Sequence, residues 1–299
     1  MPSQRLVATL VANPSRPAVT PDVVAAAARA LGGETLAAEL ASGIAADLLF
    51  EGSDAKAAEA RLRDGIEGVP IDVIVQAEAT RRKRLFLADM DSTMIGQECI
   101  DELADFVGLK AEVSEITERA MRGEIAFEPA LRERVALLAG LPVGVIDEIL
   151  ESRITLMPGG RALVGTMRAA GAYAALVSGG FTLFTGPVAA RIGFHEHRSN
   201  RLVVEGERLA GRVEEPILGR EAKLAALVEL RGRLGLRAHE TLAVGDGAND
   251  LAMLGEAGLG VAFRAKPAVA AAAHARVDHG DLTALLFAQG YRARDFVEG

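Results

Sequence analysis

The stretch Leu85-Phe-Leu-Ala-Asp-Met-Asp-Ser-Thr (residues 85–93) joins a short apolar run to two carboxylates, Asp89 and Asp91. Short apolar runs are typical of strands that are buried on both faces of a parallel sheet. Residues 172–177 and 241–244 form two further runs, which lead into Ser178 and into the sequence Gly-Asp-Gly-Ala-Asn-Asp (245–250). Polar groups just past the carboxyl ends of parallel strands meet in one crevice, where open α/β sheets bind ligands. The sequence therefore predicts an α/β fold with one polar crevice.

The side chains expected in this crevice are four carboxylates, one hydroxyl and one ammonium: Asp89, Asp91, Asp246, Asp250, Ser178 and Lys223. Carboxylates so close together repel and raise one another's pKa. A hard cation such as Mg²⁺, which prefers oxygen ligands, removes that conflict. A carboxylate beside the cation can attack a phosphoryl group and form an aspartyl-phosphate. A second carboxylate two residues later can protonate the leaving group and then activate water.

Each of these motifs has a simpler interpretation when it stands alone. An Asp-x-Asp pair is commonly a solvated turn, Ser-Gly-Gly a loop and Gly-Asp-Gly a turn, and a single lysine is normally on the surface. Their occurrence in order, each after an apolar run, is what indicates chemistry. In that arrangement Ser178, Lys223 and the backbone N–H groups of Gly179 and Gly180 can hold phosphoryl oxygens.

The combined pattern resembles the haloacid dehalogenase-like phosphatases, and more narrowly their phosphoserine phosphatase group. Residues 89–93 match the family motif Asp-x-Asp-Ser-Thr, residues 178–180 match its Ser-Gly-Gly, Lys223 its lysine, and residues 245–250 its Gly-Asp-Gly-x-Asn-Asp. Met90 stands where the family often has Phe, and Ala252 where Pro is common. Both are apolar exchanges that should leave the chemistry intact.

The resemblance implies a Rossmann-like core made of residues 84–97 and 156–299, with a small helical cap inserted at 98–155. It implies that Asp89 is the nucleophile and Asp91 the general acid and base, and that Mg²⁺ lies on Asp89, the backbone carbonyl of Asp91, and Asp246. Asp250 would support the metal site or Lys223. The residues implied to bind the substrate are Ser178, Gly179, Lys223 and Asn249 for the phosphoryl group, Glu98 and Arg134 for the amino-acid end, and Met121 and Phe127 as further cap contacts.

The reaction implied by this resemblance is hydrolysis of O-phospho-L-serine to L-serine and phosphate, the last step of serine biosynthesis. One alternative keeps the mechanism but changes the substrate: a phosphatase or phosphotransferase acting on another small phosphomonoester. Another is a regulatory protein that binds an amino acid and whose core is no longer catalytic. The presence of every motif carboxylate and of Lys223 argues against that last alternative.

Residues 1–80 are expected to form a separate α+β domain. Their apolar runs and helix signals predict the order βαββαβ, as in a ferredoxin-like (ACT-like) sandwich. One helix is predicted at 21–32, with Thr20 as its N-cap, and another at 53–65, with Ser53 as its cap. Amino-acid sensing is what the family resemblance suggests for such a domain. A packing or dimerisation role, which would give a homodimer, is an equal alternative.

The overall composition limits the classes of partner. The 299 residues carry a net charge of −8 and a pI near 5.3, which argues against binding to nucleic acid or an anionic membrane. The basic run 81–84 is interpreted as a solvated linker. The single cysteine, Cys99, excludes an intrachain disulfide and suits the reducing cytoplasm. Since no apolar run reaches about 18 residues and no signal peptide is recognised, we expect a cytoplasmic protein that acts on a small molecule.

Overall fold

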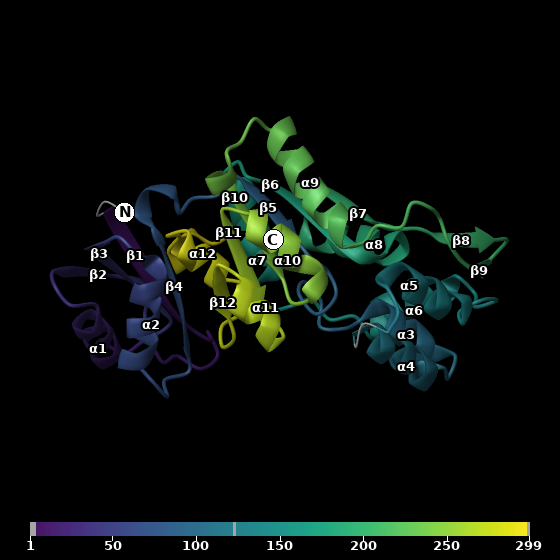
Figure 1. Cartoon of the computed structure of the whole chain (residues 1–299), viewed down its shortest axis with the longest axis horizontal. Coiled ribbons are helices and arrows are strands. Elements are labelled where there is room, and N and C mark those ends of the chain that lie inside the picture. The colour runs from purple at the N-terminus through teal and green to yellow at the C-terminus, as the bar shows by residue number, and fades with distance from the viewer. Residues whose placement is uncertain (1–3, 122–123, 298–299) are drawn as a thin grey trace.

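The computed structural model, which describes residues 4–121 and 124–297, arranges the chain as three parts in a row (Figure 1). A domain built from the N-terminal residues lies at one end, a larger α/β core lies in the middle, and a helical cap lies at the other end. The described residues contain no helix that is both long and apolar enough to cross a membrane.

The N-terminal domain has the predicted βαββαβ order, and its antiparallel sheet has the strand order β2-β3-β1-β4. Its elements are β1 (Gln4–Ala12), α1 (Pro21–Leu31), β2 (Thr35–Ala41), β3 (Ala45–Gly52), α2 (Ala55–Gly65) and β4 (Ile71–Ala77). The cap of α1 is confirmed, because Val23 N–H donates to the Thr20 hydroxyl (3.3 Å). The cap predicted for α2 is wrong. Asp54, not Ser53, accepts the hydrogen bond from Ala57 N–H (3.0 Å).

The core contains a six-stranded parallel sheet in the order β12-β11-β10-β5-β6-β7, which confirms the predicted Rossmann-like α/β fold. The strands are β5 (Leu85–Ala88), β6 (Tyr173–Phe181), β7 (Glu196–Asn200), β10 (Thr241–Gly245), β11 (Leu259–Phe263) and β12 (Ala275–Val277). Side chains alternate between the two faces of a strand. Phe86 and Ala88 therefore pack on one layer of helices, and Leu85 and Leu87 on the other.

Both layers cover the sheet with apolar side chains. The first layer consists of α7 (Gly160–Ala169), α8 (Thr182–Ile192) and α12 (Ala284–Ala288), and the second of α9 (Arg220–Arg233), α10 (Leu251–Glu256) and α11 (Pro267–Ala272). Because the central strands are buried on both faces, their sequences are continuous apolar runs, as expected for parallel strands.

The cap is inserted between β5 and α7. Its helices are α3 (Cys99–Phe106), α4 (Lys110–Met121), α5 (Phe127–Ala136) and α6 (Gly144–Ser152). The two chain crossings between cap and core pair side by side, because Gly96 N–H donates to Thr155 O (3.0 Å) and Met157 N–H to Met94 O (2.9 Å). A hairpin of β8 (Leu202–Glu205) and β9 (Arg208–Val213) extends from the core and docks on the cap through Gly140 N–H to Leu209 O (2.8 Å).

Buried polar contacts join the N-terminal domain to the core. Asp72 of β4 is fully buried and accepts hydrogen bonds from the backbone N–H groups of residues 278, 279 and 280, at distances from 2.7 to 3.3 Å. Arg81 makes an ion pair with Asp47 (2.8 Å) and donates to the backbone oxygens of residues 287 and 288 in α12. Specific hydrogen bonds and an ion pair therefore hold the N-terminal domain against the core.

The basic run 81–84 is only partly the solvated linker expected from sequence, because Arg82 and Arg84 are exposed whereas Arg81 and Lys83 are not. The Arg81 side chain is only 12% exposed, and Lys83 is buried and donates to Thr80 O (2.8 Å) and His239 O (2.9 Å). Arg82 lies over the Tyr291 ring at 3.5 Å, a cation–π contact. Burial lowers the pKa of Lys83 to about 8. These cations tie the chain at the junction between the two domains.

Replacing Asp72 by Ala should lower the free energy of unfolding by about 3 kcal/mol, because buried backbone N–H groups lose a charged acceptor. Asp72→Asn keeps one acceptor oxygen and should cost less. The exposed Asp64→Ala on α2 provides the control, which should unfold like the wild type. Urea unfolding followed by circular dichroism measures all three. Equal midpoints for Asp72→Ala and Asp64→Ala would show that the buried contact does not hold the domains together.

Candidate active site

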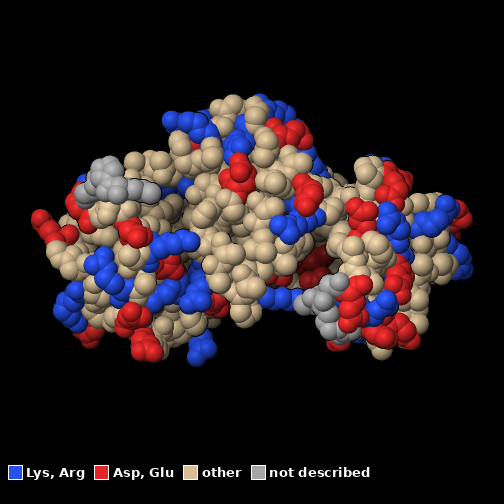
Figure 2. All heavy atoms as spheres, viewed as in Figure 1, with Lys and Arg blue, Asp and Glu red and all other residues tan. Residues whose placement is uncertain are grey.

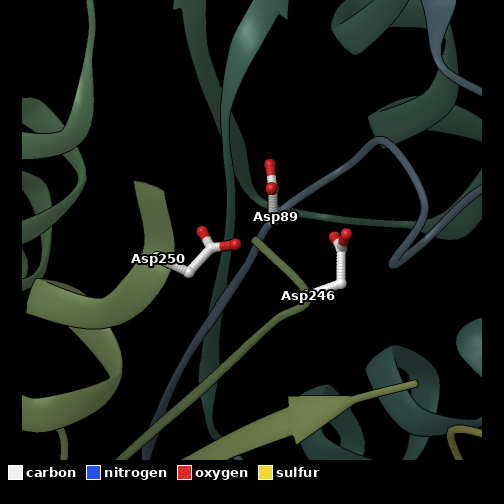
Figure 3. Close-up of side chains that lie close together, drawn as sticks. All are labelled: Asp89, Asp246 and Asp250. Atoms are coloured by element: carbon white, nitrogen blue, oxygen red, sulfur yellow. The ribbon is translucent and has the colours of Figure 1, made fainter. Parts of the chain in front are cut away.

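Three carboxylates meet at the carboxyl ends of the neighbouring strands β5 and β10. Asp89 follows β5, Asp246 follows β10, and Asp250 ends the short 3-10 helix η3 (Ala248–Asp250). One carboxylate oxygen from each of the three lies within 4.8 Å of the others. Figure 3 shows these side chains close together. The crevice predicted from parallel-strand geometry is therefore where these aspartates gather.

Lys223, in the first turn of α9, is the cation at the centre of this group. Its Nζ lies 2.7 Å from Asp89 Oδ2 and 2.7 Å from Asp250 Oδ1, and its side chain is only 1% exposed. Burial on its own would lower the pKa of Lys223, but the two carboxylates outweigh burial and raise it. The second Asp89 oxygen, Oδ1, accepts a hydrogen bond from Met90 N–H (2.8 Å). Lys223 is therefore a fixed charge that orients Asp89.

The three carboxylates offer the oxygen ligands that a divalent metal ion such as Mg²⁺ prefers. Burial and the nearby charge of Asp89 raise the pKa of Asp246 to about 6 and that of Asp250 to about 7. Thr93 donates to Asp246 Oδ1 (2.9 Å), which fixes that carboxylate. Lys223 supplies one positive charge against three carboxylates, so a hard cation with oxygen ligands would relieve the remaining repulsion. Asp250 already contacts Lys223, as predicted for a supporting residue.

Asp91 lies beside Glu98 at the boundary between core and cap. Burial raises the pKa of Asp91 well above its ordinary value, and the charges of Glu98 and Asp89 add to this shift. Glu98 still reaches solvent, yet desolvation raises its pKa to about 7. Ser92 donates to Glu98 Oε1 (2.7 Å), and its φ of 55° turns the chain sharply between the two acids. The two residues form an acidic pair next to Asp89.

The last residues of β6 supply the neutral side of the site. Ser178 is 1% exposed, and its Oγ accepts a hydrogen bond from Gly180 N–H (2.9 Å). A Cβ on Gly180 would lie 3.0 Å from Asp91 Oδ2, so a side chain at this position of β6 would require the Asp91 carboxylate to shift. Asn249 lies in η3, which follows β10, and its Oδ1 would be 2.2 Å from a Cβ on Gly247. The residues predicted to bind the phosphoryl group thus come from β6, α9 and η3.

Two residues at the site were not among the predicted candidates. Asn200, at the end of β7, is buried and donates to Gly179 O (2.8 Å) and Leu218 O (3.1 Å), and it accepts from Leu218 N–H (2.6 Å). It fixes the end of β6 against the segment that leads to α9. Nothing in the local sequence marks Asn200, since it ends an ordinary polar strand. Thr93, which holds Asp246, could have been found because it belongs to the quoted motif.

The cap brings some of its predicted residues to the site. Phe127, at the start of α5, lies against core glycines, because a Cβ at Gly179 or Gly219 would be 3.4 Å or 3.3 Å from its ring. Arg134 donates to Ala130 O (3.2 Å) and Thr117 Oγ1 (3.3 Å), and it lies within electrostatic range of Glu98. Met121 ends α4, and its side chain lies outside the described part of the chain.

Comparison with known proteins establishes the family. The family model of haloacid dehalogenase-like hydrolases matches residues 86–255, which is more than half of the chain. A phosphoserine phosphatase from Polaromonas sp. is 47% identical over 208 residues, covering 68% of this chain and 88% of that protein. This chain belongs to the phosphoserine phosphatase family of haloacid dehalogenase-like hydrolases.

Two solved structures extend the comparison with this family. A haloacid dehalogenase family hydrolase from Salmonella enterica serovar Typhi has a TM-score of 0.85 at 27% identity, covering 95% of this chain and 97% of that one. A phospho-aspartyl intermediate analogue of phosphoserine phosphatase has a TM-score of 0.64 at 37% identity, covering 69% of this chain and 98% of that one. The first likeness extends over the N-terminal domain as well as the core and cap.

Replacing Lys223 by Met should abolish activity and lower the free energy of unfolding by about 3–5 kcal/mol, because two buried carboxylates lose their partner. Adding Asp250→Asn to that variant removes one of the unpaired charges, so part of the stability should return while activity stays lost. Urea unfolding and phosphate release measure the two effects. Wild-type activity in Lys223→Met would contradict its placement beside the reacting carboxylate.

Proposed function

We propose that this protein hydrolyses O-phospho-L-serine to L-serine and phosphate, the final step of serine biosynthesis. The observation that carries the proposal is the Asp89 carboxylate, which is held by buried Lys223 and lies under a cap with opposite charges on Glu98 and Arg134. The family relationship and the likeness to a phospho-aspartyl intermediate analogue support it. The cytoplasmic location, the homodimer and the domain limits 1–80, 84–97 with 156–299, and 98–155 stay predictions.

The metal proposed for this site is Mg²⁺, held by Asp89, Asp246 and the backbone carbonyl of Asp91. When bound, it would neutralise charge on the carboxylates and on the phosphoryl oxygens. Thr93 orients Asp246 toward this role through its hydrogen bond, and Asp250 would support the site by pairing with Lys223 at 2.7 Å.

In the first chemical step, an Asp89 carboxylate oxygen attacks phosphorus and the bond from phosphorus to the serine oxygen breaks. Asp91 gives its proton to that serine oxygen, so L-serine leaves as an alcohol. Lys223, Ser178 and the N–H group of Gly179 would bind the phosphoryl oxygens, and Asn249 would help to place them. The product of this step is an aspartyl-phosphate on Asp89.

In the second step, the Asp91 carboxylate takes a proton from water, and the water oxygen attacks phosphorus. The bond between phosphorus and the Asp89 oxygen breaks, which releases phosphate and restores both carboxyl groups to their starting states. Phe127 packs against Gly179 and Gly219 at the entrance, so a closed cap would limit other water from reaching the intermediate.

The cap would select the substrate by charge. Arg134 offers a planar fork for the serine carboxylate, and Glu98 offers a negative charge for the serine ammonium. Both residues are partly enclosed, so their charges are screened less than those on the open surface. A phosphomonoester without the amino-acid end would leave these charges unpaired.

We expect kcat/KM for L-phosphoserine to exceed that for an aryl phosphate by about a hundredfold (about 2.7 kcal/mol), with D-phosphoserine and phosphothreonine also tested. Arg134→Met should remove most of this preference. Arg132→Met is the matched control, because Arg132 lies on the same helix but pairs with Glu215 (2.6 Å). Phosphate release measures all variants. A flat substrate profile in the wild type would reject the cap assignment while leaving the phosphatase core in place.

Chelation of divalent metal should abolish phosphate release, and added Mg²⁺ should restore it. Asp246→Asn should raise the half-saturating Mg²⁺ concentration by about tenfold or more, as expected when a metal site loses an oriented ligand. Asp89→Asn should stay inactive at any Mg²⁺ concentration, because an amide does not act as the nucleophile. Full activity in EDTA, or turnover by Asp89→Asn, would argue against this mechanism.

A further inference from the structure

A cavity of about 270 Å³ lies between the N-terminal domain and the core, away from the candidate active site. Helix α2 forms one wall, and α11 with the start of β12 forms the other. The active site lies at the carboxyl ends of β5 and β10, whereas this cavity lies at the amino end of the edge strand β12. Neither the metal-site carboxylates nor the cap contributes to its lining.

Positive charge gathers around this cavity. Lys56 and Arg63 of α2 face Arg276 of β12 across it, and Glu59 is the one acidic residue that lines it. Figure 2 shows Lys and Arg side chains along the boundary between the N-terminal domain and the core. Glu59 pairs with Arg63 and Asp278 pairs with Arg276, so the three cations leave a local excess of one positive charge in a chain whose net charge is −8. Like charges repel, so this grouping favours an anion as an occupant.

Existing contacts orient two of the cations but leave the third available. Arg63 pairs with Glu59 (2.7 Å) and donates to Val73 O (3.2 Å), which fixes its guanidinium at the wall. Arg276 pairs with Asp278 at 3.3 Å through Nε. Within residues 4–121 and 124–297, the Lys56 side chain makes no ion pair or hydrogen bond. Its ammonium is exposed and can turn toward a bound group.

His274 adds a neutral donor to the same wall. Its Nδ1 accepts a hydrogen bond from Gly260 N–H (3.0 Å), so the proton of the neutral ring is on Nε2. Burial lowers the pKa of His274, and the charges of Lys56 and Lys83 lower it further. The ring therefore experiences a positive field, and a bound anion would reverse this effect and raise its pKa.

The rest of the lining is small and apolar. Five alanine side chains complete the two walls, and they leave space beside the charged groups. Pockets for drug-sized ligands begin near about 300 Å³, so a volume of about 270 Å³ suits a smaller molecule. Several donors from two directions match a tetrahedral group with several acceptor oxygens better than a planar carboxylate with two.

We propose that this interdomain cavity binds a small tetrahedral oxyanion, either free phosphate or the phosphate group of a small metabolite. Lys56 and Arg63 from the N-terminal domain and Arg276 and His274 from the core would share the bound group. Because its ligands come from both domains, binding would stabilise their contact. This site is separate from the catalytic one and does not depend on which phosphomonoester the enzyme hydrolyses.

Histidine NMR tests this proposal on the full chain. The chain has five histidines, and the variant His274→Gln assigns the His274 ring signal by its disappearance. Inorganic phosphate is then titrated at constant pH and ionic strength, with chloride as the exchanged ion. We expect a saturable shift of the His274 signal and a higher His274 pKa in the bound state. Phosphate that binds only at the active site would leave this signal unchanged, which would overturn the proposal.

Variants that each remove one positive charge distinguish phosphate binding in this cavity from a general effect of ions on the protein. Lys56→Gln and Arg276→Gln should each weaken phosphate binding by about tenfold, the effect of one lost charge-assisted hydrogen bond. Arg212→Gln is the matched control, because Arg212 is an exposed arginine paired with Glu205 on the distant hairpin. An identical titration in Lys56→Gln and Arg212→Gln would overturn the proposal, even if the wild-type signal moves.

A second titration distinguishes the two sources of the oxyanion. Ethylphosphonate carries the same headgroup with a short alkyl chain, and its carbon–phosphorus bond resists hydrolysis. Tighter binding than phosphate would support a metabolite whose apolar part lies on the alanine wall. Equal binding would support free phosphate as the occupant. Binding of neither compound would reject the site.

Discussion

The ion pairs of Lys223 with Asp89 and Asp250 are the constraint on which the active site depends. An ammonium that is 1% exposed is stable only because two carboxylates lie 2.7 Å from it. The same contacts hold Asp89 with one oxygen toward Lys223 and the other on Met90 N–H. Burial and the charge of Asp89 raise the pKa of Asp246 and that of Asp250, and the single charge of Lys223 does not offset these effects. The side chains of the site are therefore held in place, but one lysine does not neutralise the charge of the three carboxylates. A bound metal ion would supply the missing positive charge.

Glycines in the backbone allow these charged side chains to lie so close to one another. A Cβ on Gly245 would lie 2.3 Å from Asp250 Cγ, so only glycine at the end of β10 allows Asp250 to reach Lys223. Gly247 N–H donates to Asp250 Oδ2 (3.1 Å), which leaves Oδ1 for the lysine. On the other side, Gly180 in β6 leaves room for Asp91 Oδ2, which would lie 3.0 Å from a Cβ there. The glycines of two motifs thus set the distances between charged groups, and their role is steric as much as conformational.

Local signals in the sequence predicted much of this structure. Apolar runs located the central strands, and the polar residues after them located the crevice, because both depend on short stretches of chain. Prediction from local sequence failed where the position of a side chain depends on residues far away in the chain. Burial of Arg81 and Lys83 requires α12 and His239 O, which are remote in sequence. Asn200 is another example, since its two partners, Gly179 O in β6 and Leu218 O before α9, come from separate segments of the chain.

The contacts at the domain junction also connect the N-terminal domain with the base of the cap. Asp72 holds the backbone of residues 278–280, and Leu282 N–H, two residues later, donates to Pro158 O (3.1 Å). A Cβ on Gly159 would lie 2.7 Å from Thr283 N, so these two loops touch without room for a side chain. Met157 N–H in turn donates to Met94 O, where the chain enters the cap. Interiors packed this closely transmit displacement rather than absorb it. The contacts that hold the N-terminal domain on the core therefore continue, through residues 282–283 and 157–159, to the loop that supports the cap.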